Sequence, residues 1–217
     1  MFKTTIKKYI SKLLYMSLIP ITSSIIASSL HDINFNYSHK VGVYIGSFDP
    51  LHKGHEAIIN MVLDQYCDYV IVVADDYVNP KKPHRTAYHI RQKMLRAAFA
   101  NQPRVIICDI NQEQLLHYLR PKNVQLYGIL GSDCAFEQTV SDFIAPHWII
   151  VPRKEHEQHL QGMQTLSGSP VIIAPFYSVD ISSTLIKQKI QQGLPIDNYE
   201  LSPAVMQVII EHQLYRS

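Results

Sequence analysis

Two histidines lie three residues apart at the start of a predicted helix, where they could stabilise a phosphate group. The segment from Gly46 to His55 reads GSFDPLHKGH and follows a short apolar run. The N-terminus of a helix presents unpaired backbone N–H groups and a positive dipole end, both of which favour an anion. His52 and His55 add side-chain donors at the same place. The segment therefore predicts phosphoryl or nucleotidyl transfer, which depends mostly on positioning and charge stabilisation.

Two other interpretations of this segment are a metal site and a structural turn. A metal site needs a third ligand, and none is evident nearby in the sequence. The segment has neither the GxxxxGK[ST] pattern of a P-loop nor the GxGxxG pattern of a dinucleotide-binding turn. The glycines would permit a tight turn and the close approach of a phosphate. The candidate binding residues here are Gly46, Ser47, Phe48, Asp49 and Gly54.

A second candidate anion site lies near the C-terminus, in the segment ISSTLIK from residue 181 to 187. Ser182 and Ser183 are favourable helix N-caps, but capping alone would explain only one of them. Two hydroxyl groups, Thr184 and a cation one turn later favour a second phosphate site. Lys187 would supply the charge, although it lacks the bidentate fork of an arginine.

The chain after residue 40 alternates apolar runs with segments of helical spacing. This alternation predicts an α/β fold, Rossmann-like and doubly wound, with a mainly parallel sheet and helices on both faces. Ligands of such sheets bind beyond the C-terminal ends of the strands, where both candidate sites lie. The expected strands are 41–45, 69–74, 105–108, 124–130, 148–151 and 171–174, and the expected helices are 54–65, 86–99, 112–119, 182–192 and 203–212.

The first segment closely resembles the HxGH signature of the nucleotidyltransferase superfamily, and the second resembles its ISSTxxR element, with Lys187 in place of arginine. Other segments resemble bacterial nicotinate-mononucleotide adenylyltransferases, so that the resemblance covers residues 41–217. The C-terminal segments GLP, LSPAV and EHQLY belong to it. So do Pro83-His84-Arg85, the helix that begins RQKML at Arg91, and Gly131-Ser132-Asp133.

The resemblance implies transfer of AMP from ATP to nicotinate or nicotinamide mononucleotide, with release of pyrophosphate, in NAD biosynthesis. His52 and His55 would stabilise charge at the α-phosphate, and Ser182, Ser183 and Lys187 would hold the leaving pyrophosphate. Mg²⁺ would be bound through the substrate phosphates. The further nucleotide- or substrate-binding residues implied are His84, Arg85, Arg91, Gly131, Asp133 and Thr184.

Two departures from the family pattern concern the acceptor. The Ser-Tyr-Thr stretch that relatives carry after the third strand is missing, and so is the tryptophan that follows Gly-x-Asp in them. Trp148 falls in the next predicted strand and is interpreted as core, whereas Phe143 could be core or could stack on the acceptor. Alternatives therefore stay open: another phosphorylated acceptor, such as pantetheine phosphate or an alcohol or sugar phosphate, or a nucleotide-binding relative without turnover.

The charge distribution divides the 217 residues into two parts. Residues 1–40 hold five lysines and one acidic residue, which leaves 15 basic and 17 acidic side chains in the rest. The body therefore lacks the basic excess of a nucleic-acid-binding protein. Three scattered cysteines argue against a disulfide scaffold or a cysteine zinc site. Residues 41–217 are expected to form the catalytic domain, and a homo-oligomer stays open.

The N-terminal forty residues are interpreted as an extension with a linker. Four lysines precede an acid-free apolar stretch from Leu13 to Ile26, and small residues follow it, as in a secretory signal. A membrane-associated amphipathic helix and an extension without a role are the alternatives. ATP-dependent chemistry favours the cytoplasm, whereas a signal would favour export or an organelle.

Overall fold

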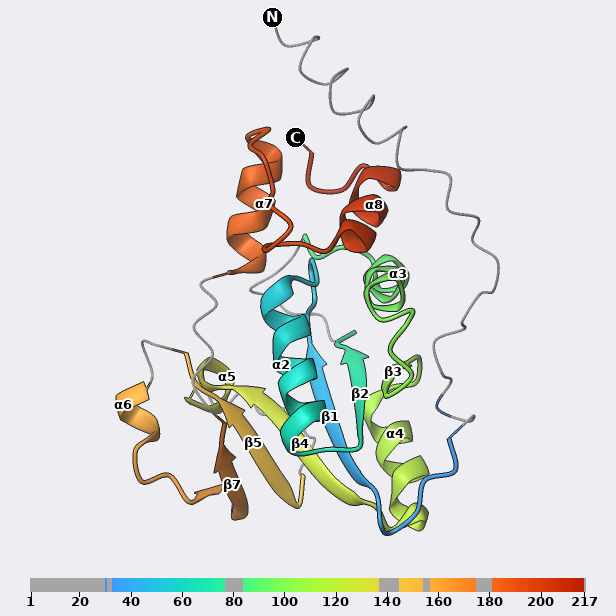
Figure 1. The fold of residues 1–217 in the computed structure, drawn as a ribbon, viewed down its shortest axis with the longest axis vertical. Coiled ribbons are helices and arrows are strands. Elements are labelled where there is room, and N and C mark those ends of the chain that lie inside the picture. Colours follow the sequence, from blue (N-terminus) through green and yellow to red (C-terminus); the bar gives the residue numbers. More distant parts are fainter. Residues whose placement is uncertain are drawn as a thin grey trace, which may run out of the picture.

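Six parallel strands and one short antiparallel strand form a single sheet in the computed structural model, which describes residues 30, 33–76, 84–136, 145–153, 157–174 and 181–216 (Figure 1). The strands are β1 (Lys40–Gly46), β2 (Tyr69–Ala74), β3 (Val105–Cys108), β4 (Gln125–Gly131), β5 (His147–Val151), β6 (Thr165–Leu166) and β7 (Ser169–Ile173). The helices are α2 (Lys53–Gln65), α3 (Tyr88–Ala98), α4 (Gln112–Leu119), the 3₁₀ helix η2 (Arg120–Lys122), α5 (Ser132–Phe136), α6 (Glu157–Leu160), α7 (Ser183–Gln191) and α8 (Pro203–Glu211).

The strand order β3-β2-β1-β4-β5-β7-β6 places a switch point between β1 and β4. The chain runs from β1 outward to β3 and then returns to the other side of β1, so β1 pairs with both β2 and β4 in parallel. The crevice beyond such a switch point is where doubly wound sheets bind ligands. Gly46 ends β1 and Gly131 ends β4, so the histidine segment and the Gly131-Ser132-Asp133 segment both border this crevice. The predicted fold class is confirmed.

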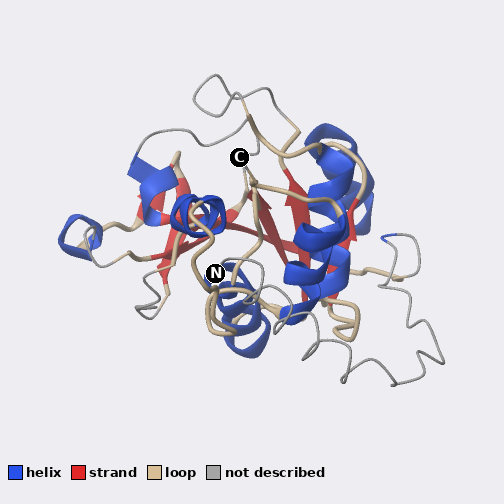
Figure 2. Cartoon of the chain, turned by 90° about the horizontal axis from the view of Figure 1, so that it is seen from above, coloured by secondary structure: helices blue, strands red, loops and turns tan. Residues whose placement is uncertain are grey.

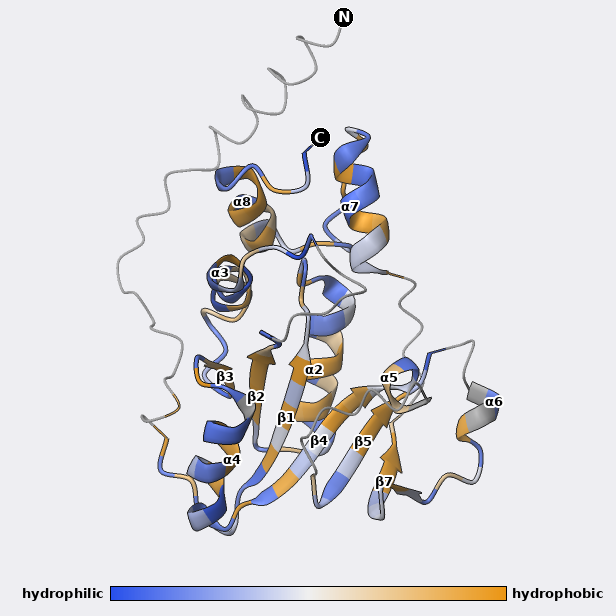
Figure 3. Cartoon of the chain, turned by 180° about the vertical axis from the view of Figure 1, so that it is seen from behind, coloured by the Kyte–Doolittle hydropathy of each residue, from blue (hydrophilic) through white to orange (hydrophobic). Residues whose placement is uncertain are grey.

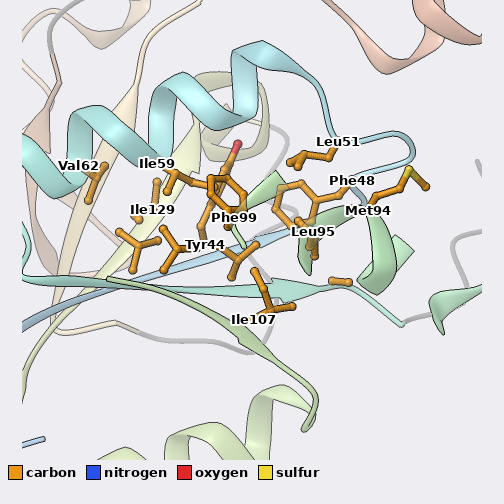
Figure 4. Close-up of a cluster of buried hydrophobic side chains, with 14 of the residues drawn as sticks. Tyr44, Phe48, Leu51, Ile59, Val62, Met94, Leu95, Phe99, Ile107 and Ile129 are labelled. Carbon is orange, nitrogen blue, oxygen red and sulfur yellow. The ribbon is translucent and has the colours of Figure 1, made fainter. Parts of the chain in front are cut away.

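Two apolar cores lie on opposite faces of the sheet, with helices on both sides of the strands (Figure 2). In β2, Val70 and Val72 face one core, while Ile71 and Val73 face the other, because successive strand side chains point to opposite faces. Helices α2, α3, α7 and α8 contribute to the first core, whose packing beneath α2 is seen in Figure 4. Helix α4 covers the second, and Figure 3 shows hydrophilic and hydrophobic residues mixed along it.

The observed bounds of the predicted elements differ from the expected ones by two residues at most. Hydrophobic periodicity did not predict η2, α5, α6 or β6. Each of these has two to five residues, too few to show a hydrophobic period.

Residues ahead of position 41 also contribute to the second core. Leu30 and Phe35 are 3% and 2% exposed, and the Tyr118 hydroxyl donates a 3.0 Å hydrogen bond to the Leu30 carbonyl. The lysine-rich segment and the whole apolar stretch from Leu13 to Ile26 lie outside the described residues. Among the helices that the structure does describe, none is long and apolar enough to cross a membrane.

Trp148 on β5 is 1% exposed, which confirms its interpretation as core, and it packs against a glycine of β4. A Cβ atom at position 128 would lie 2.2 Å from Cζ3 of Trp148 and 3.0 Å from the Ala145 Cβ. We expect Gly128→Ala to lower the free energy of unfolding by about 1–3 kcal/mol, the usual cost of overpacking a core. Denaturant unfolding measures this loss.

Trp148→Phe supplies the matched background for that measurement, because it removes the ring atoms that a Cβ at position 128 would meet. Gly128→Ala should therefore cost less stability in the Trp148→Phe protein than in the wild type. The same loss in both backgrounds would contradict the steric explanation.

Candidate active site

The loop between β1 and α2 is anchored in the first core by two apolar side chains. Phe48 and Leu51 are 1% and 0% exposed and lie beneath the start of α2 (Figure 4). Phe48 has a φ of 46°, and its ring covers Gly46, where a Cβ would lie 2.9 Å from the Phe48 Cζ. Phe48 thus holds the loop from inside, and Gly46 is needed for that packing.

The two histidines form a stacked pair at the N-terminus of α2. His52 is the N-cap residue, and the ring centroids of His52 and His55 are 3.7 Å apart with 24° between the ring planes. The His52 backbone N–H donates a 3.3 Å hydrogen bond to Nδ1 of His55. A Cβ at position 54 would lie 3.0 Å from Cε1 and Nδ1 of His52, so Gly54 leaves room for this ring.

His52 is buried in a way that keeps its imidazole neutral. Its side chain is 7% exposed, and its Nδ1 has no hydrogen-bond partner among the described residues. Burial, and secondarily the positive charge of Arg153, lower the pKa of His52 to about 4. A bound polyphosphate would raise this pKa again, because an opposite charge nearby favours the protonated ring. The pair can therefore offer N–H donors to an anion that enters the crevice.

Helix α7 meets the histidine loop through its first residues and its lysine. Ser182 caps the helix and accepts a 3.2 Å hydrogen bond from the Leu185 backbone N–H. The Ser183 hydroxyl donates to the Pro50 carbonyl at 3.0 Å. Lys187 Nζ lies 2.5 Å from Oδ2 of Asp49. The two predicted anion-binding segments, far apart in the chain, are thus joined side by side.

Asp49 is a buried, ionised carboxylate within the histidine loop. It is 4% exposed. Burial opposes its ionisation, but hydrogen bonds from Lys187, Thr86 and Tyr215 and the charge of Lys187 keep the pKa of Asp49 below its usual value. The negative charge of Asp49 therefore fixes the position of the Lys187 ammonium group.

Arg91 supports the loop from below. It is 1% exposed, and its guanidinium group donates hydrogen bonds to the carbonyls of Thr86, Ser47 and Asp75 at 2.8–2.9 Å. These carbonyls belong to the loop after β1, the end of β2 and the approach to α3. One planar group with several donors thus ties three segments of the crevice together.

The end of β4 places a second charged pair at the crevice. Arg153 Nη2 lies 3.1 Å from Oδ2 of Asp133, and the Arg153 backbone N–H donates to the Ser132 hydroxyl at 2.9 Å. A Cβ at position 131 would lie 2.5 Å from Oδ1 of Asp133, so Gly131 lets the carboxylate fold back over the strand end.

A cavity of about 440 Å³ opens at the C-terminal ends of β1, β2 and β3. It adjoins the histidine loop, since the Asp75 backbone N–H donates a 2.8 Å hydrogen bond to the Gly46 carbonyl. The cavity is lined by Ile45, Val73, Ala74, Asp75, Asp76, Tyr88, Asp109, Ile110, Asn111 and Glu113. Its size suits a small organic group, and its lining holds four carboxylates.

Comparison with known proteins shows the family to which the chain belongs. A family model described as cytidylyltransferase-like matches residues 43–189, which is more than half of the chain. The chain belongs to the cytidylyltransferase-like family. The resemblance of the HxGH and ISST segments to a nucleotidyltransferase is therefore confirmed.

The curated relatives place the chain within one group of this family. A protein named probable nicotinate-nucleotide adenylyltransferase from Bacillus pumilus (strain SAFR-032) is 30% identical over 201 residues, which cover 82% of this chain and 99% of the relative. Proteins of the same name from Helicobacter pylori and from a Nitratiruptor species are 39% and 38% identical over 44% and 43% of this chain. Those two matches span only 61% and 59% of the relatives' own lengths.

The solved structures agree on the fold. Plasmodium falciparum nicotinic acid mononucleotide adenylyltransferase complexed with NaAD superposes with a TM-score of 0.65 at 20% identity, covering 82% of this chain and 97% of that chain. A putative nicotinate-nucleotide adenylyltransferase from Vibrio parahaemolyticus gives a TM-score of 0.56 at 16% identity, covering 82% of this chain and 96% of that chain.

The remaining residues that the sequence singled out differ in exposure and in their contacts. Arg85 Nη1 pairs with Oδ2 of Asp75 at 3.0 Å beside the cavity, whereas His84 and Thr184 are exposed. Phe143 and Pro83 lie outside the described residues.

Sequence reasoning missed three residues of the site, namely Thr86, Arg153 and Tyr215. Arg153 follows a strand end beside β4, so the rule that ligands bind at strand ends could have indicated it. Thr86 and Tyr215 gave no such signal, because their contacts join distant parts of the chain.

The depressed pKa of His52 predicts a protein that loses stability in acid. The folded-state pKa is about 4 and the ordinary value is 6.5, so between these values the unfolded chain binds a proton that the folded protein does not. The free energy of unfolding should therefore fall as the pH drops from 7 toward 4, by on the order of 3 kcal/mol in full. Urea unfolding at pH 7.5 and pH 5 measures the trend.

His52→Gln removes this titration, and we expect its stability to depend less on pH than that of the wild type. His117→Gln, on the exposed side of α4, is the matched control and should keep the wild-type dependence. Identical pH dependence in the wild type and His52→Gln would refute the assignment to His52.

Proposed function

We propose that the protein is an adenylyltransferase that transfers AMP from ATP to nicotinate or nicotinamide mononucleotide and releases pyrophosphate, a step of NAD biosynthesis. The observation that carries the proposal is the stacked His52–His55 pair at a helix N-terminus, set at the switch point of the sheet. The names of the curated relatives support the choice of acceptor.

In this reaction an oxygen of the acceptor phosphate attacks the α-phosphorus of ATP in line. The bond from that phosphorus to the bridging oxygen breaks, and pyrophosphate leaves with the bonding electrons. No covalent protein nucleophile is needed, so the side chains act by positioning and by stabilising charge. His52 and His55 would donate to the α-phosphate oxygens, which gain charge in the transition state.

The other phosphates of ATP would meet the start of α7. There Lys187, the Ser182 and Ser183 hydroxyl groups and the backbone N–H groups of the first turn favour an anion. Gly131 and Asp133 at the end of β4 would contact the nucleoside. This arrangement explains how a body with more acidic than basic residues could bind a polyphosphate, since its positive potential is local.

A Mg²⁺ ion fits this site only through the substrate. Within the described residues, no three histidine, cysteine or acidic side chains come together as a set of metal ligands. Mg²⁺ commonly takes few protein ligands and coordinates substrate phosphates, where it neutralises charge. We therefore propose that Mg²⁺ enters with ATP.

The acceptor would occupy the cavity beside the histidine loop, which lies next to Gly46 and is wide enough for a pyridine ring with its amide or carboxylate. A second candidate is the same transfer to another phosphorylated acceptor. The missing Ser-Tyr-Thr stretch favours this alternative.

Release of pyrophosphate from ATP in the presence of different acceptors tests the proposal. Nicotinate mononucleotide, nicotinamide mononucleotide, phosphopantetheine and a sugar phosphate form the panel. Release with a pyridine mononucleotide supports the proposed function. Release with only one of the other phosphates supports the second candidate, and ATP binding without release from any acceptor would reject both.

We propose a cytoplasmic location because the reaction depends on ATP, and export or an organellar location through residues 1–40 is the alternative. N-terminal sequencing of the mature protein tests this placement, because an intact Met1 would exclude cleavage of a signal.

A further inference from the structure

The C-terminal end of the chain reaches the histidine loop through one tyrosine. Tyr215 lies beyond α8, and its hydroxyl donates a 2.6 Å hydrogen bond to Oδ1 of Asp49, a residue 166 positions earlier. No sequence pattern assigns a role to Tyr215, and the proposed reaction does not use its side chain directly. Its hydroxyl nevertheless contacts the buried carboxylate of Asp49, which also pairs with Lys187.

The hydrogen bonds around this tyrosine have a fixed direction. Asp49 is ionised and can only accept, so the Tyr215 hydroxyl must donate to it. That hydroxyl in turn accepts a 3.2 Å hydrogen bond from Oγ1 of Thr86, and the Thr86 backbone N–H donates to Oδ2 of Asp49 at 3.2 Å. Burial raises the pKa of Tyr215, which keeps the hydroxyl protonated as this arrangement requires.

The same tyrosine also contacts the lysine that Asp49 holds. Lys187 Nζ lies 5.2 Å from the centre of the Tyr215 ring and 2.5 Å from Oδ2 of Asp49. The lysine is thus placed between a carboxylate and an aromatic face, both of which attract a cation. Only one of its three ammonium hydrogens is needed for Asp49, so the others can reach a phosphate.

The backbone after α8 also adopts an unusual conformation near this contact. Gln213 and Tyr215 have φ values of 50° and 59°, in the left-handed region that residues with side chains seldom adopt. Such conformations persist when surrounding contacts hold them and are concentrated at functional sites. Here they turn the ring of Tyr215 inward, where Asp49 and Thr86 hold it.

We propose that Tyr215 is a positioning residue for adenylyl transfer, which acts through Asp49 to fix the Lys187 ammonium group where the β- and γ-phosphates of ATP bind. This inference rests on the proposed function only where it names the reaction. Binding of ATP and pyrophosphate can be measured without an acceptor. In this role Tyr215 would act without touching either substrate. It completes the hydrogen bonding of Asp49, and Asp49 orients the lysine.

Tyr215→Phe is the sharpest variant, because it removes the hydroxyl and keeps the ring. We expect the KM for ATP and the inhibition constant of pyrophosphate to rise about tenfold, the effect of one lost hydrogen bond to a charged group. The KM for the acceptor should stay at its wild-type value. Tyr199→Phe changes an exposed tyrosine, 67% accessible, and serves as the control with unchanged constants.

A tyrosine that only stabilises the fold would give a different result. Equal changes in the constants for ATP and for the acceptor, or a lower melting temperature with unchanged constants, would overturn the proposal. Thr86→Val removes the other side-chain partner of the hydroxyl and should raise the same two constants by a smaller factor.

A double-mutant cycle tests whether the effect of Tyr215 on ATP and pyrophosphate binding depends on Lys187. In a Lys187→Met background, Tyr215→Phe should change ATP and pyrophosphate binding little, because the group that Tyr215 positions is gone. A tenfold loss in both backgrounds would show that Tyr215 acts independently of Lys187 and would overturn the proposal.

Calorimetric titration with ATP alone distinguishes failure of the positioning role from failure of the proposed function. If the wild type binds ATP and Tyr215→Phe weakens that binding, the positioning role stands even when no pyridine mononucleotide is adenylylated. If the acceptors react but ATP binding is equal in both proteins, the proposed function stands and the positioning role is rejected.

Discussion

His52→Ala is expected to lower kcat by about 10²- to 10³-fold, the loss seen when one donor to a developing oxyanion is removed. His52 is buried at the N-terminus of α2, and its Nδ1 has no partner among the described residues. Its interaction with the α-phosphate should strengthen as charge accumulates in the transition state, so kcat should fall more than the KM for ATP rises. Steady-state pyrophosphate release measures both constants.

The controls for this variant separate chemistry from folding. His52→Asn keeps a donor at the site and should retain more activity than the alanine variant, whereas His117→Ala on α4 should be unchanged. A kcat for His52→Ala equal to that of the wild type would refute the role of the histidine. A rise in the KM for ATP with an unchanged kcat would assign His52 to ground-state binding alone.

The second large effect is expected for Arg91→Met, through stability. Three main-chain carbonyls, those of Ser47, Asp75 and Thr86, would lose their guanidinium donor in the interior. An orphaned buried acceptor costs about 1–3 kcal/mol, so the variant should lose at least 3 kcal/mol of unfolding free energy. Methionine keeps most of the side-chain volume, so the loss would reflect hydrogen bonding more than a cavity. Denaturant unfolding measures it.

Arg120→Met is the matched control, because Arg120 is exposed at the end of α4 and its loss should change stability by less than about 0.5 kcal/mol. Arg91→Lys should fall between the two, since an ammonium group cannot reach three diverging carbonyls. A loss below 1 kcal/mol for Arg91→Met would mean that the carbonyls find other partners.

The order of strands and helices could be predicted from the sequence because it depends on local patterns. The apolar run at Tyr69–Ala74 is nearly continuous, as expected of a strand buried on both faces, and its bounds agree with the structure. The histidine segment could be located because it must follow a strand and open a helix, whatever the rest of the chain does. The cap at Ser182 is equally local.

The shape of the site depended on contacts that no local pattern encodes. Asp49, Lys187 and Tyr215 meet across separations of 138 and 166 residues, and the sequence gives no period or spacing that links them. Arg91 shares the buried helical face of Met94 and Leu95, but no local pattern shows that its guanidinium group would meet three distant main-chain carbonyls.

The sequence by itself therefore determined the longer elements, the parallel sheet and the position of the two candidate anion-binding segments, because hydrophobic period, turn residues and helix caps act over a few residues. The tertiary structure decided which charged groups pair. Strand order brings the ends of β1 and β4 together, and burial then requires a partner for each carboxylate and guanidinium group. These partners come from whichever segments the fold has made neighbours.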